Sequence, residues 1–354
     1  MNNIEKIREA LASLGFDALL VTDPANRLYA TAFDSSAGVL LVTTDNAWFY
    51  TDSRYIEAAG AAVKNANVLL ATVEDTYADQ IKKVLNEQGI TAVGFEDNTV
   101  TYSWHQKWAE KLEIELIPAR NILSDLRAIK SPGDLEKMKK AQLIAEKSFL
   151  EILPLINTDI TEKELAAELT YRFIKNGADD KSFDCIVVSG QKSSLPHGVP
   201  GDMKIGKGFL TIDFGARLDG WCSDTTRTLC VGRPDDEMKN VYDTVLHAQE
   251  AGIKAARAGV LGSDVDAAAR SVIEAAGYGA YFGHGFGHGL GLEVHETPTA
   301  SRTSEDILSA GAVISAEPGI YLPGRFGVRI EDVLHITENG SENITGLTKE
   351  LIIL

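Results

Sequence analysis

Residues 283–298 of this 354-residue chain read GHGFGHGLGLEVHETP, and glycine occupies every second position of the first nine. Glycines in such a run let the backbone come close to a bulky or charged group. His284, His288 and His295 fall within the run, and we expect the three imidazoles to face a common site. The alternative is a glycine-rich loop with surface histidines. The run lacks the GxGxxG spacing of dinucleotide-binding loops and the second histidine of an HExxH zinc motif.

Two parts of the second half of the chain share one pattern, in which two strand-like runs surround a glycine-containing turn and each run carries one carboxylate. The carboxylates are Asp213 and Asp224 in the first part, and Glu317 and Glu331 in the second. Asp213 lies between apolar residues, where an isolated carboxylate would cost several kcal/mol unless it is paired or metal-bound. The pattern therefore indicates a duplication with four carboxylates around one centre.

Four negative charges at one centre would be neutralised by two divalent cations. The alternative is that each acid lies on the surface, or pairs with Arg227 or Arg329. Carboxylate oxygens are hard ligands, so manganese or cobalt is favoured over a thiolate-type zinc site, although zinc itself stays open.

The composition excludes several classes of function. The chain has 51 Asp and Glu against 34 Lys and Arg, and its formal charge of −17 repels nucleic acids and anionic membrane surfaces. The three cysteines form no CxxC motif, so neither a disulfide framework nor a thiolate zinc site is expected. No apolar run approaches the ~18 residues of a membrane span, and the charged N-terminus does not resemble a signal peptide. We therefore expect a cytoplasmic protein without nucleic-acid or membrane partners.

The hydrophobic pattern predicts an α/β (α+β) chain of two domains, residues 1–125 and 126–354, joined by a polar segment over 119–130. In the first domain a helical period stops at Gly15, a typical residue after a helix C-terminus. The elements expected there are helices at 4–14, 77–85 and 104–112, and strands at 17–21, 38–42, 47–50, 92–95 and 114–117, with a hairpin turn at 44–46.

The second domain opens with a helix capped by Ser131, with Pro132 at its first position. A second capping box, Thr161 to Glu164, begins a helix that ends at Gly177. Beyond it, β-like runs alternate with long helical patterns at 237–257 and 263–276.

Five ordered motifs of the second domain together resemble the "pita-bread" metallopeptidases, which include Xaa-Pro dipeptidase, aminopeptidase P and, more remotely, methionine aminopeptidase. The motifs are SSLPHG at 193–198, DFG to CSDTTRT at 213–228, GHGLGLEVHETP at 287–298, EPGIY at 317–321 and GVRIED at 327–332. Residues 51–55, TDSRY, also resemble the N-terminal domain of the proline-specific members. The resemblance implies a creatinase-like N-terminal α/β domain followed by a pseudo-twofold pita-bread catalytic domain.

The resemblance implies the metal ligands. Asp213 would bind one metal, Asp224 and Glu331 would bridge two, and His288 and Glu317 would complete the second site. All five ligand positions are intact, which argues against metal-free, peptide-binding relatives of this fold.

The resemblance also implies the residues that act on the substrate. Glu317 would carry the proton from the attacking water to the leaving nitrogen, while His197 and His295 would hydrogen-bond the substrate and the developing oxyanion. His284 matches a histidine near the residue after the scissile bond, and Arg329 matches an arginine that supports the last carboxylate.

These roles predict a dinuclear metal-dependent exopeptidase that cleaves the Xaa-Pro bond at the N-terminus of peptides, as aminopeptidase P does. Dipeptidases similar to this chain often carry an arginine after the HExP run, whereas here Thr299 follows and the nearest arginine is Arg302. The departure favours the aminopeptidase over an Xaa-Pro dipeptidase, or prolidase. A non-catalytic peptide-binding module and a methionine-type aminopeptidase are further alternatives. A homodimer is expected, because family members commonly dimerise.

One cysteine and three histidines stand outside these roles. Cys222 is either a further ligand or, the favoured interpretation, a small buried side chain. His335 either faces the centre or, as we favour, lies at an exposed strand end. His105 and His247 fall in helical patterns without partners and receive no role.

Overall fold

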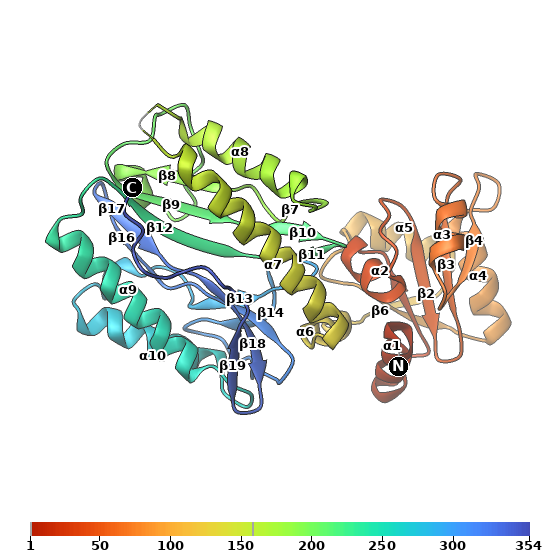
Figure 1. The fold of residues 1–354 in the computed structure, drawn as a ribbon. Coiled ribbons are helices and arrows are strands. Elements are labelled where there is room, and N and C mark those ends of the chain that lie inside the picture. Colours follow the sequence, from red (N-terminus) through yellow and green to blue (C-terminus); the bar gives the residue numbers. More distant parts are fainter. Residues whose placement is uncertain (1, 158) are drawn as a thin grey trace. The chain divides into compact units, whose positions relative to one another are not determined.

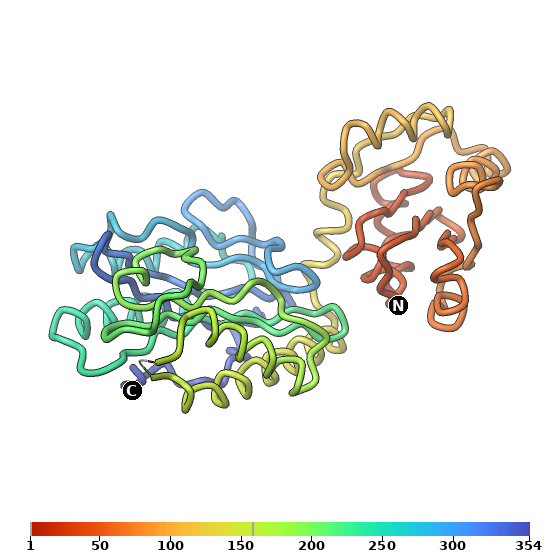
Figure 2. Tube along the Cα trace, turned by 90° about the horizontal axis from the view of Figure 1, so that it is seen from above, coloured from red at the N-terminus to blue at the C-terminus, as the bar shows by residue number. Residues whose placement is uncertain are grey.

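The computed structural model describes residues 2–157 and 159–354. The chain divides into two compact units that meet between Arg127 and Ala128. Figure 2 traces the first unit from red to orange and the second from yellow to blue. Among the described residues, no helix is both long and apolar enough to cross a membrane.

The first unit is built on a six-stranded sheet with the strand order β4-β3-β2-β1-β5-β6. The strands are β1 (Ala18–Val21), β2 (Val39–Thr43), β3 (Ala47–Thr51), β4 (Asn67–Leu70), β5 (Ala92–Phe95) and β6 (Glu115–Pro118). The helices are α1 (Asn3–Leu14), α2 (Pro24–Thr31), α3 (Ile56–Ala62), α4 (Tyr77–Gln88), α5 (Tyr102–Leu112) and α6 (Ile122–Ala128). Side chains such as Leu20, Leu41 and Ile81 form its core and are fully buried.

The predicted elements of this unit are confirmed. Gly15 follows α1 in the left-handed region, with φ at 76°, and its N–H bonds to the carbonyl of Leu11. β2 and β3 pair antiparallel across the predicted turn, with Val42 opposite Ala47. The expectation of a polar connection over residues 119–130 is corrected, because α6 occupies most of that segment and buries Leu123.

The first half of the second unit packs two helices on strands. The helices are α7 (Pro132–Ile152) and α8 (Glu162–Lys175), with a 3-10 turn, η1 (Leu153–Leu155), between them, and a second turn, η2 (Gly190–Ser194), follows β8. The strands are β7 (Asp180–Lys181), β8 (Ile186–Ser189), β9 (Gly208–Phe214), β10 (Ala216–Leu218), β11 (Trp221–Cys222) and β12 (Thr225–Val231). Both predicted capping boxes are present, so the interpretation of Ser131 and Thr161 as helix starts is confirmed.

The second half repeats the plan with α9 (Asp236–Ala255) and α10 (Gly262–Ala275), followed by the 3-10 turn η3 (Gly279–Tyr281). Its strands are β13 (Gly287–Gly289), β14 (Glu296–Ala300), β15 (Val313–Ala316), β16 (Gly319–Leu322), β17 (Phe326–Arg329), β18 (Asp332–Thr337) and β19 (Gly340–Asn343). Five of them form a sheet in the order β14-β13-β15-β18-β19, and β16 pairs with β17.

Each half of the second unit has its own core. α7 and α8 cover β8, β9 and β12, where the rings of Phe149 and Phe214 stack with centroids 5.1 Å apart. α9 and α10 cover the strands of the other half, where Val245, Phe286 and Ile314 are fully buried. Figure 1 shows the two helix pairs on opposite sides of the strands. The strands of both halves therefore lie between the two helix pairs.

Candidate metal centre and active site

The second unit contains a cavity of about 530 Å³. All nine site residues predicted from the sequence line it: Asp213, Asp224, His288, Glu317, Glu331, His197, His284, His295 and Arg329. Phe183, Ile186, Pro196 and Val294 add an apolar wall. A largely formed cavity with an apolar wall and converging charged groups has the usual composition of a small-molecule site.

Strand pairing brings the four acids together, which we call the carboxylate cluster (Asp213, Asp224, Glu317 and Glu331). β9 pairs with β12, so Asp213 lies opposite Thr226 and Asp224 lies directly before the partner strand. The expectation that Asp224 lies in the strand-like run after Asp213 is wrong. Residues 216–222 form a separate small hairpin, and Asp224 follows it. In the other half, Glu317 lies just before β16 and Glu331 just after β17, so the two acids flank the open end of the β16–β17 hairpin.

The glycines of the 283–298 run do allow a close approach, but the neighbour is backbone. A Cβ on Gly287 would lie 1.9 Å from the carbonyl oxygen of Ser315, and one on Gly289 would lie 2.5 Å from that of Thr297. β13 therefore fits tightly between β14 and β15, and this packing directs the side chain of His288 into the cavity.

His288 lies at the middle of the cluster. Its Nε2 is 3.1 Å from Glu317 Oε1 and 3.7 Å from Asp224 Oδ2, while its Nδ1 bonds to the carbonyl of Gly289 at 3.0 Å. Ligand atoms of Asp224, His288 and Glu331 all lie within 4.8 Å of one another, a spacing suited to a metal ion. The other two predicted ligands, Asp213 and Glu317, turn toward protein cations instead.

Arg329 is the cation next to the cluster. Its Nη2 donates to Asp213 Oδ2 at 2.7 Å and its Nε lies 4.0 Å from Glu317 Oε2. Further hydrogen bonds run from Arg329 to the hydroxyls of Thr226 and Tyr321. The alternative that an acid of the cluster pairs with Arg329 therefore holds for Asp213.

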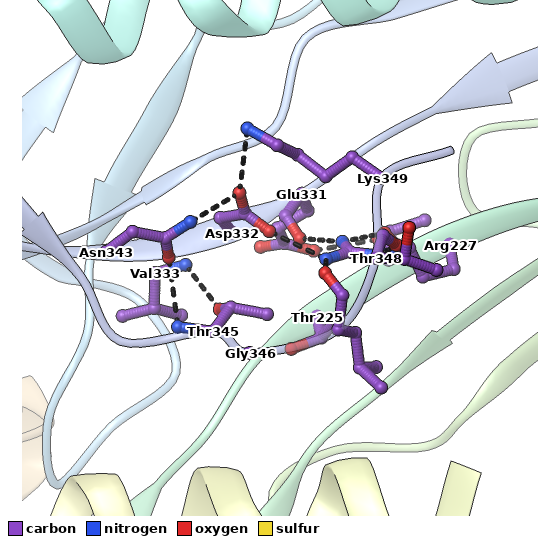
Figure 3. Close-up of polar contacts among 12 residues, drawn as sticks. Thr225, Arg227, Glu331, Asp332, Val333, Asn343, Thr345, Gly346, Thr348 and Lys349 are labelled. Atoms are coloured by element: carbon purple, nitrogen blue, oxygen red, sulfur yellow. Dashed lines mark hydrogen bonds and ion pairs between the residues drawn. The ribbon is translucent and has the colours of Figure 1, made fainter. Parts of the chain in front are cut away.

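Arg227, the other candidate partner, belongs to a different network, which we call the arginine cluster (Arg227, Asp332, Asn343 and Lys349) (Figure 3). Arg227 donates to Asp332 Oδ1 at 2.8 Å, and its other hydrogen bonds go to backbone carbonyls, including that of Glu331. It pairs with none of the carboxylate cluster's side chains in the described structure.

Burial and mutual repulsion shift the pKa values of the four acids. Burial raises the pKa of Asp224 well above its usual range, and the charge of Glu331 adds to the effect. Burial likewise raises the pKa of Glu331, with the Glu317 charge as the next cause, and it raises that of Asp213 despite the opposing charge of Arg329. Burial would also raise the pKa of Glu317, but the hydrogen bond and charge of His288 outweigh it and hold that pKa at about 2.

The cluster fits divalent metal ions. Asp213 Oδ1 and Glu331 Oε1 are buried and have no hydrogen-bond partner among the described residues. Four carboxylates face one guanidinium, that of Arg329, and one imidazole beside them, that of His288, so acidic groups outnumber the protein's cationic groups in a buried place. Buried, unpartnered carboxylate oxygens in excess of the local cations are the donor set that hard divalent ions take.

The three remaining histidines differ in how they are held. His284 Nε2 lies 3.0 Å from the hydroxyl of Tyr321, which accepts a hydrogen bond from Arg329 at 2.8 Å. Burial lowers the pKa of His284, and burial together with the charge of His288 lowers that of His295. The ring of His295 lies against that of His288, with centroids 4.3 Å apart. His197 is exposed at the rim.

Sequence reasoning missed three residues that orient the site. The hydroxyl of Thr226 donates to Glu331 Oε2 at 2.7 Å, and that of Ser315 donates to Glu317 Oε1 at 3.1 Å. Tyr321 links Arg329 to His284. Thr226 and Tyr321 both fall inside the quoted motifs, so their place beside the acids was the available signal.

The interpretation of Cys222 as a small buried side chain is confirmed, since its thiol donates to the carbonyl of Leu292 and it does not line the cavity. His335 is on β18 next to Glu342, with its side chain 19% exposed, and does not reach the cavity, so it is neither a ligand nor a fully exposed strand end.

Comparison with known families agrees with this geometry. Residues 136–338 match metallopeptidase family M24, and residues 3–129 match the creatinase/prolidase N-terminal domain. The chain belongs to metallopeptidase family M24. The predicted fold class, a creatinase-like domain followed by a pita-bread catalytic domain, is thereby confirmed, and the family implies that this M24 metallopeptidase is a hydrolase that uses divalent metal ions.

Relatives of this M24 metallopeptidase match it over nearly their whole length. The structure of an Xaa-Pro dipeptidase from Bacillus anthracis is 42% identical, with a TM-score of 0.96 and 99% of each chain covered. That of an X-Pro aminopeptidase from Thermotoga maritima is 36% identical, with a TM-score of 0.91, and the match covers 98% of this chain and 100% of that one. An Xaa-Pro dipeptidase of Pyrococcus horikoshii is 37% identical over 352 residues, which are 99% of this chain and 98% of the relative.

Proposed function

We propose that this M24 metallopeptidase hydrolyses the bond between the N-terminal residue of a peptide and a following proline, and that it accepts peptides longer than two residues. The names of its relatives support the Xaa-Pro bond as the target. The observation that carries the preference for longer peptides is a cavity whose only lysine or arginine, among the described lining residues, is already engaged.

That cation is Arg329, which donates four hydrogen bonds, to Thr226, Pro196, Tyr321 and Asp213. A dipeptidase needs a cation to hold the terminal carboxylate of its substrate, and Arg329 has little capacity left for one.

The position after the HExP run offers no cation either. Thr299 donates to Ser304 and Asp306, and Arg302, which is 70% exposed, pairs with Glu274 at 3.2 Å. The dipeptidase remains the second candidate function, because the names of two relatives favour it.

We propose that Asp213, Asp224, His288, Glu317 and Glu331 would hold the two ions. When bound, the ions would lower the pKa of the attacking water and polarise the scissile carbonyl. Manganese or cobalt is proposed for this oxygen-rich set, and elemental analysis of the protein purified without chelator tests the choice.

Glu317 is the group that moves the proton. Its ionised carboxylate accepts the proton of the attacking water and then releases it to the leaving nitrogen, which needs that proton to depart as an amine. Ser315 fixes one oxygen of Glu317 by a hydrogen bond of 3.1 Å.

The histidines contact the substrate. His197 and His295, both exposed at the cavity, hydrogen-bond the substrate and stabilise the oxyanion as it develops. His284, held by Tyr321, lies where the residue after the scissile bond binds.

Three peptides test the proposal: Ala-Pro, Ala-Pro-Ala and Met-Ala-Ala, each incubated with manganese-loaded protein. Cleavage of Ala-Pro-Ala between alanine and proline is the expected result. Cleavage of Ala-Pro alone would identify a dipeptidase, and cleavage of Met-Ala-Ala alone would overturn the proline assignment. Binding of all three without turnover would make the chain a peptide-binding module. The predicted homodimer and cytoplasmic location stay predictions, the first of which size-exclusion chromatography checks.

A further inference from the structure

The backbone segment that carries His197, residues 189–201, begins at the last residue of β8 and forms most of the connection toward β9. The ring of His197 forms no hydrogen bond or ion pair with any of the residues that the structure describes, and it is exposed. Nothing on the ring therefore fixes its place at the cavity. Its position depends on how the backbone of this segment is held.

One buried carboxylate holds that segment at both ends. Glu162, the first residue of α8, has a side chain with 0% exposure. Its Oε1 accepts from the backbone N–H of Ser189 at 2.8 Å and from the Ser189 hydroxyl at 3.2 Å. Its Oε2 accepts from the backbone N–H of Gly201 at 3.1 Å. A single side chain thus joins the first and the last residue of the segment.

The same carboxylate receives a cation from within the segment. Lys192 Nζ donates to Glu162 Oε2 at 2.6 Å, and the lysine side chain is 23% exposed. A fully buried carboxylate is costly unless a cation and hydrogen-bond donors compensate it, so Lys192 is needed to keep Glu162 where it is. The space is also tight, because a Cβ on Gly201 would come within 3.2 Å of Lys192 Nζ.

Close packing transmits this anchoring toward His197. A Cβ on Gly198 would lie 2.8 Å from Val188 Cγ1, so the segment rests directly on β8. The carbonyl of Pro196, immediately before His197, accepts a hydrogen bond from Arg329 at 3.2 Å. The segment is therefore held by Glu162, which does not line the cavity, and by Arg329, which does.

We propose that Glu162 and Lys192 form a positioning pair that sets the place of His197 against the substrate. The inference rests on the proposed function, in which His197 contacts the substrate. Neither Glu162 nor Lys192 lines the cavity, so their effect acts through the segment alone. Because displacement of a substrate-contacting group by about 1 Å can cost about 100-fold in rate, the pair controls turnover from outside the site.

Lys192→Met tests the pair, since it removes the cation and keeps the length of the side chain. We expect kcat/KM on Ala-Pro-Ala to fall about 10- to 100-fold, with metal content and circular dichroism unchanged, and Lys192→Arg to restore most of it. Lys163→Met is the matched control: Lys163 follows Glu162 on α8 and faces Asp202 at 3.9 Å, but its side chain is 71% exposed. The control should keep kcat/KM within about twofold of the unmodified protein, as expected for an exposed pair.

A double-mutant cycle with His197→Ala separates positioning from general damage. If Lys192 acts through His197, Lys192→Met will have no further effect in the His197→Ala protein. An equal loss in both backgrounds, or full activity of Lys192→Met alone, would overturn the proposed pair.

The NMR signal of the His197 ring, assigned with His197→Ala, gives a measure independent of turnover. It should shift in Lys192→Met and not in Lys163→Met, and an unshifted signal would overturn the pair. If the signal shifts but His197→Ala keeps full activity, the pair stands and the proposed role of His197 in the reaction fails instead.

Discussion

Glu331 and Asp332 are neighbours in the chain, yet the protein compensates the charge of one buried carboxylate fully and that of the other only in part. Asp332, in the arginine cluster, has both carboxylate oxygens occupied: Oδ1 by Arg227, and Oδ2 by Asn343 at 2.8 Å and Lys349 at 3.4 Å (Figure 3). Glu331, in the carboxylate cluster, has one oxygen bonded to Thr226 and the other without a described partner.

The difference shows that a buried carboxylate needs cations and hydrogen-bond donors around it, and that a buried carboxylate without them implies a cation from outside the protein. Arg227 uses all five of its N–H groups, so the arginine cluster is satisfied by the protein alone. The carboxylate cluster is only partly compensated, by Arg329 beside Asp213 and His288 beside Glu317, and buried oxygens of Asp213 and Glu331 keep no described partner. A folded chain tolerates such a deficit where a bound cation corrects it, so the deficit supports the metal site proposed above.

The largest effect is expected in the carboxylate cluster, from Asp224→Asn. Loss of this proposed metal ligand should lower kcat/KM on Ala-Pro-Ala at least about 10³-fold, which is about 4 kcal/mol of transition-state stabilisation. Bound metal, measured by elemental analysis after dialysis, should fall with it. Asp202→Asn, whose side chain is 94% exposed, serves as the control. Turnover by the metal-free Asp224→Asn protein would contradict the assignment.

In the arginine cluster, Arg227→Met should act on stability instead. Removing the guanidinium leaves Asp332 buried without its main cation, and breaking a buried pair in this way costs about 3–5 kcal/mol. Calorimetry of the catalytic unit's unfolding transition measures the loss.

The exposed pair of Lys139 and Glu342, 2.8 Å apart, supplies the contrast for Arg227→Met, because Lys139→Met should cost at most about 1 kcal/mol. Equal losses in the two variants would mean that the arginine cluster contributes no more than a surface ion pair.

A smaller effect is expected where the protein orients a ligand, from Thr226→Val. The change keeps the shape of the side chain and removes the hydroxyl that donates to Glu331 and accepts from Arg329. Manganese affinity, measured by calorimetric titration, should fall about 10- to 100-fold. Thr228→Val is the matched control, because Thr228 lies two residues along β12 and bonds only to backbone groups of Arg329 and to Thr211. A similar loss from the control would show that β12 geometry, and not this hydroxyl, matters.

The sequence predicts the charged groups of the site well, because each lies in a motif with its own chemistry. The repeated pattern of two strand-like runs with one carboxylate each points to Asp213 and Glu317, and the glycine run points to His288, while their roles as ligands follow from the family resemblance. Capping residues such as Ser131 predicted helix starts correctly, since a cap is a local interaction between residues three apart.

Contacts between distant residues were beyond the sequence. The bond from Arg329 to Thr226 joins residues 103 positions apart, and Arg227 reaches Thr348 over 121 positions. Asp224 was expected within a strand-like run but lies directly before β12, because strand pairing depends on the packing of whole sheets and not on local preference. The residues that orient the acids of the site by hydrogen bonds could be identified only from the fold.

The smallest effect, and the one that most directly separates the two clusters, is a dependence of stability on pH in the protein freed of metal by EDTA. Burial raises the pKa of Asp224 and Glu331 above the ordinary value of about 4, so the folded state binds their protons more tightly than the unfolded state does. Their contribution to stability is therefore largest near pH 4 and is lost as the pH rises through the raised values. Glu317, whose pKa is held at about 2, contributes with the opposite sign and only below about pH 4, so it does not cancel the trend.

The melting temperature of the EDTA-treated protein should thus fall as the pH rises above about 4, and less so in Asp224→Asn, which lacks one of the carboxyls with a raised pKa. Comparing these two proteins removes the part of the trend that comes from the overall charge of −17, which is nearly the same in both. Saturating manganese should flatten the dependence, because the ion binds the ionised carboxylates and compensates their repulsion. If Asp224→Asn shows the same fall as the unmodified protein, the repulsion does not reside in the carboxylate cluster, and the contrast with Asp332 loses its physical basis.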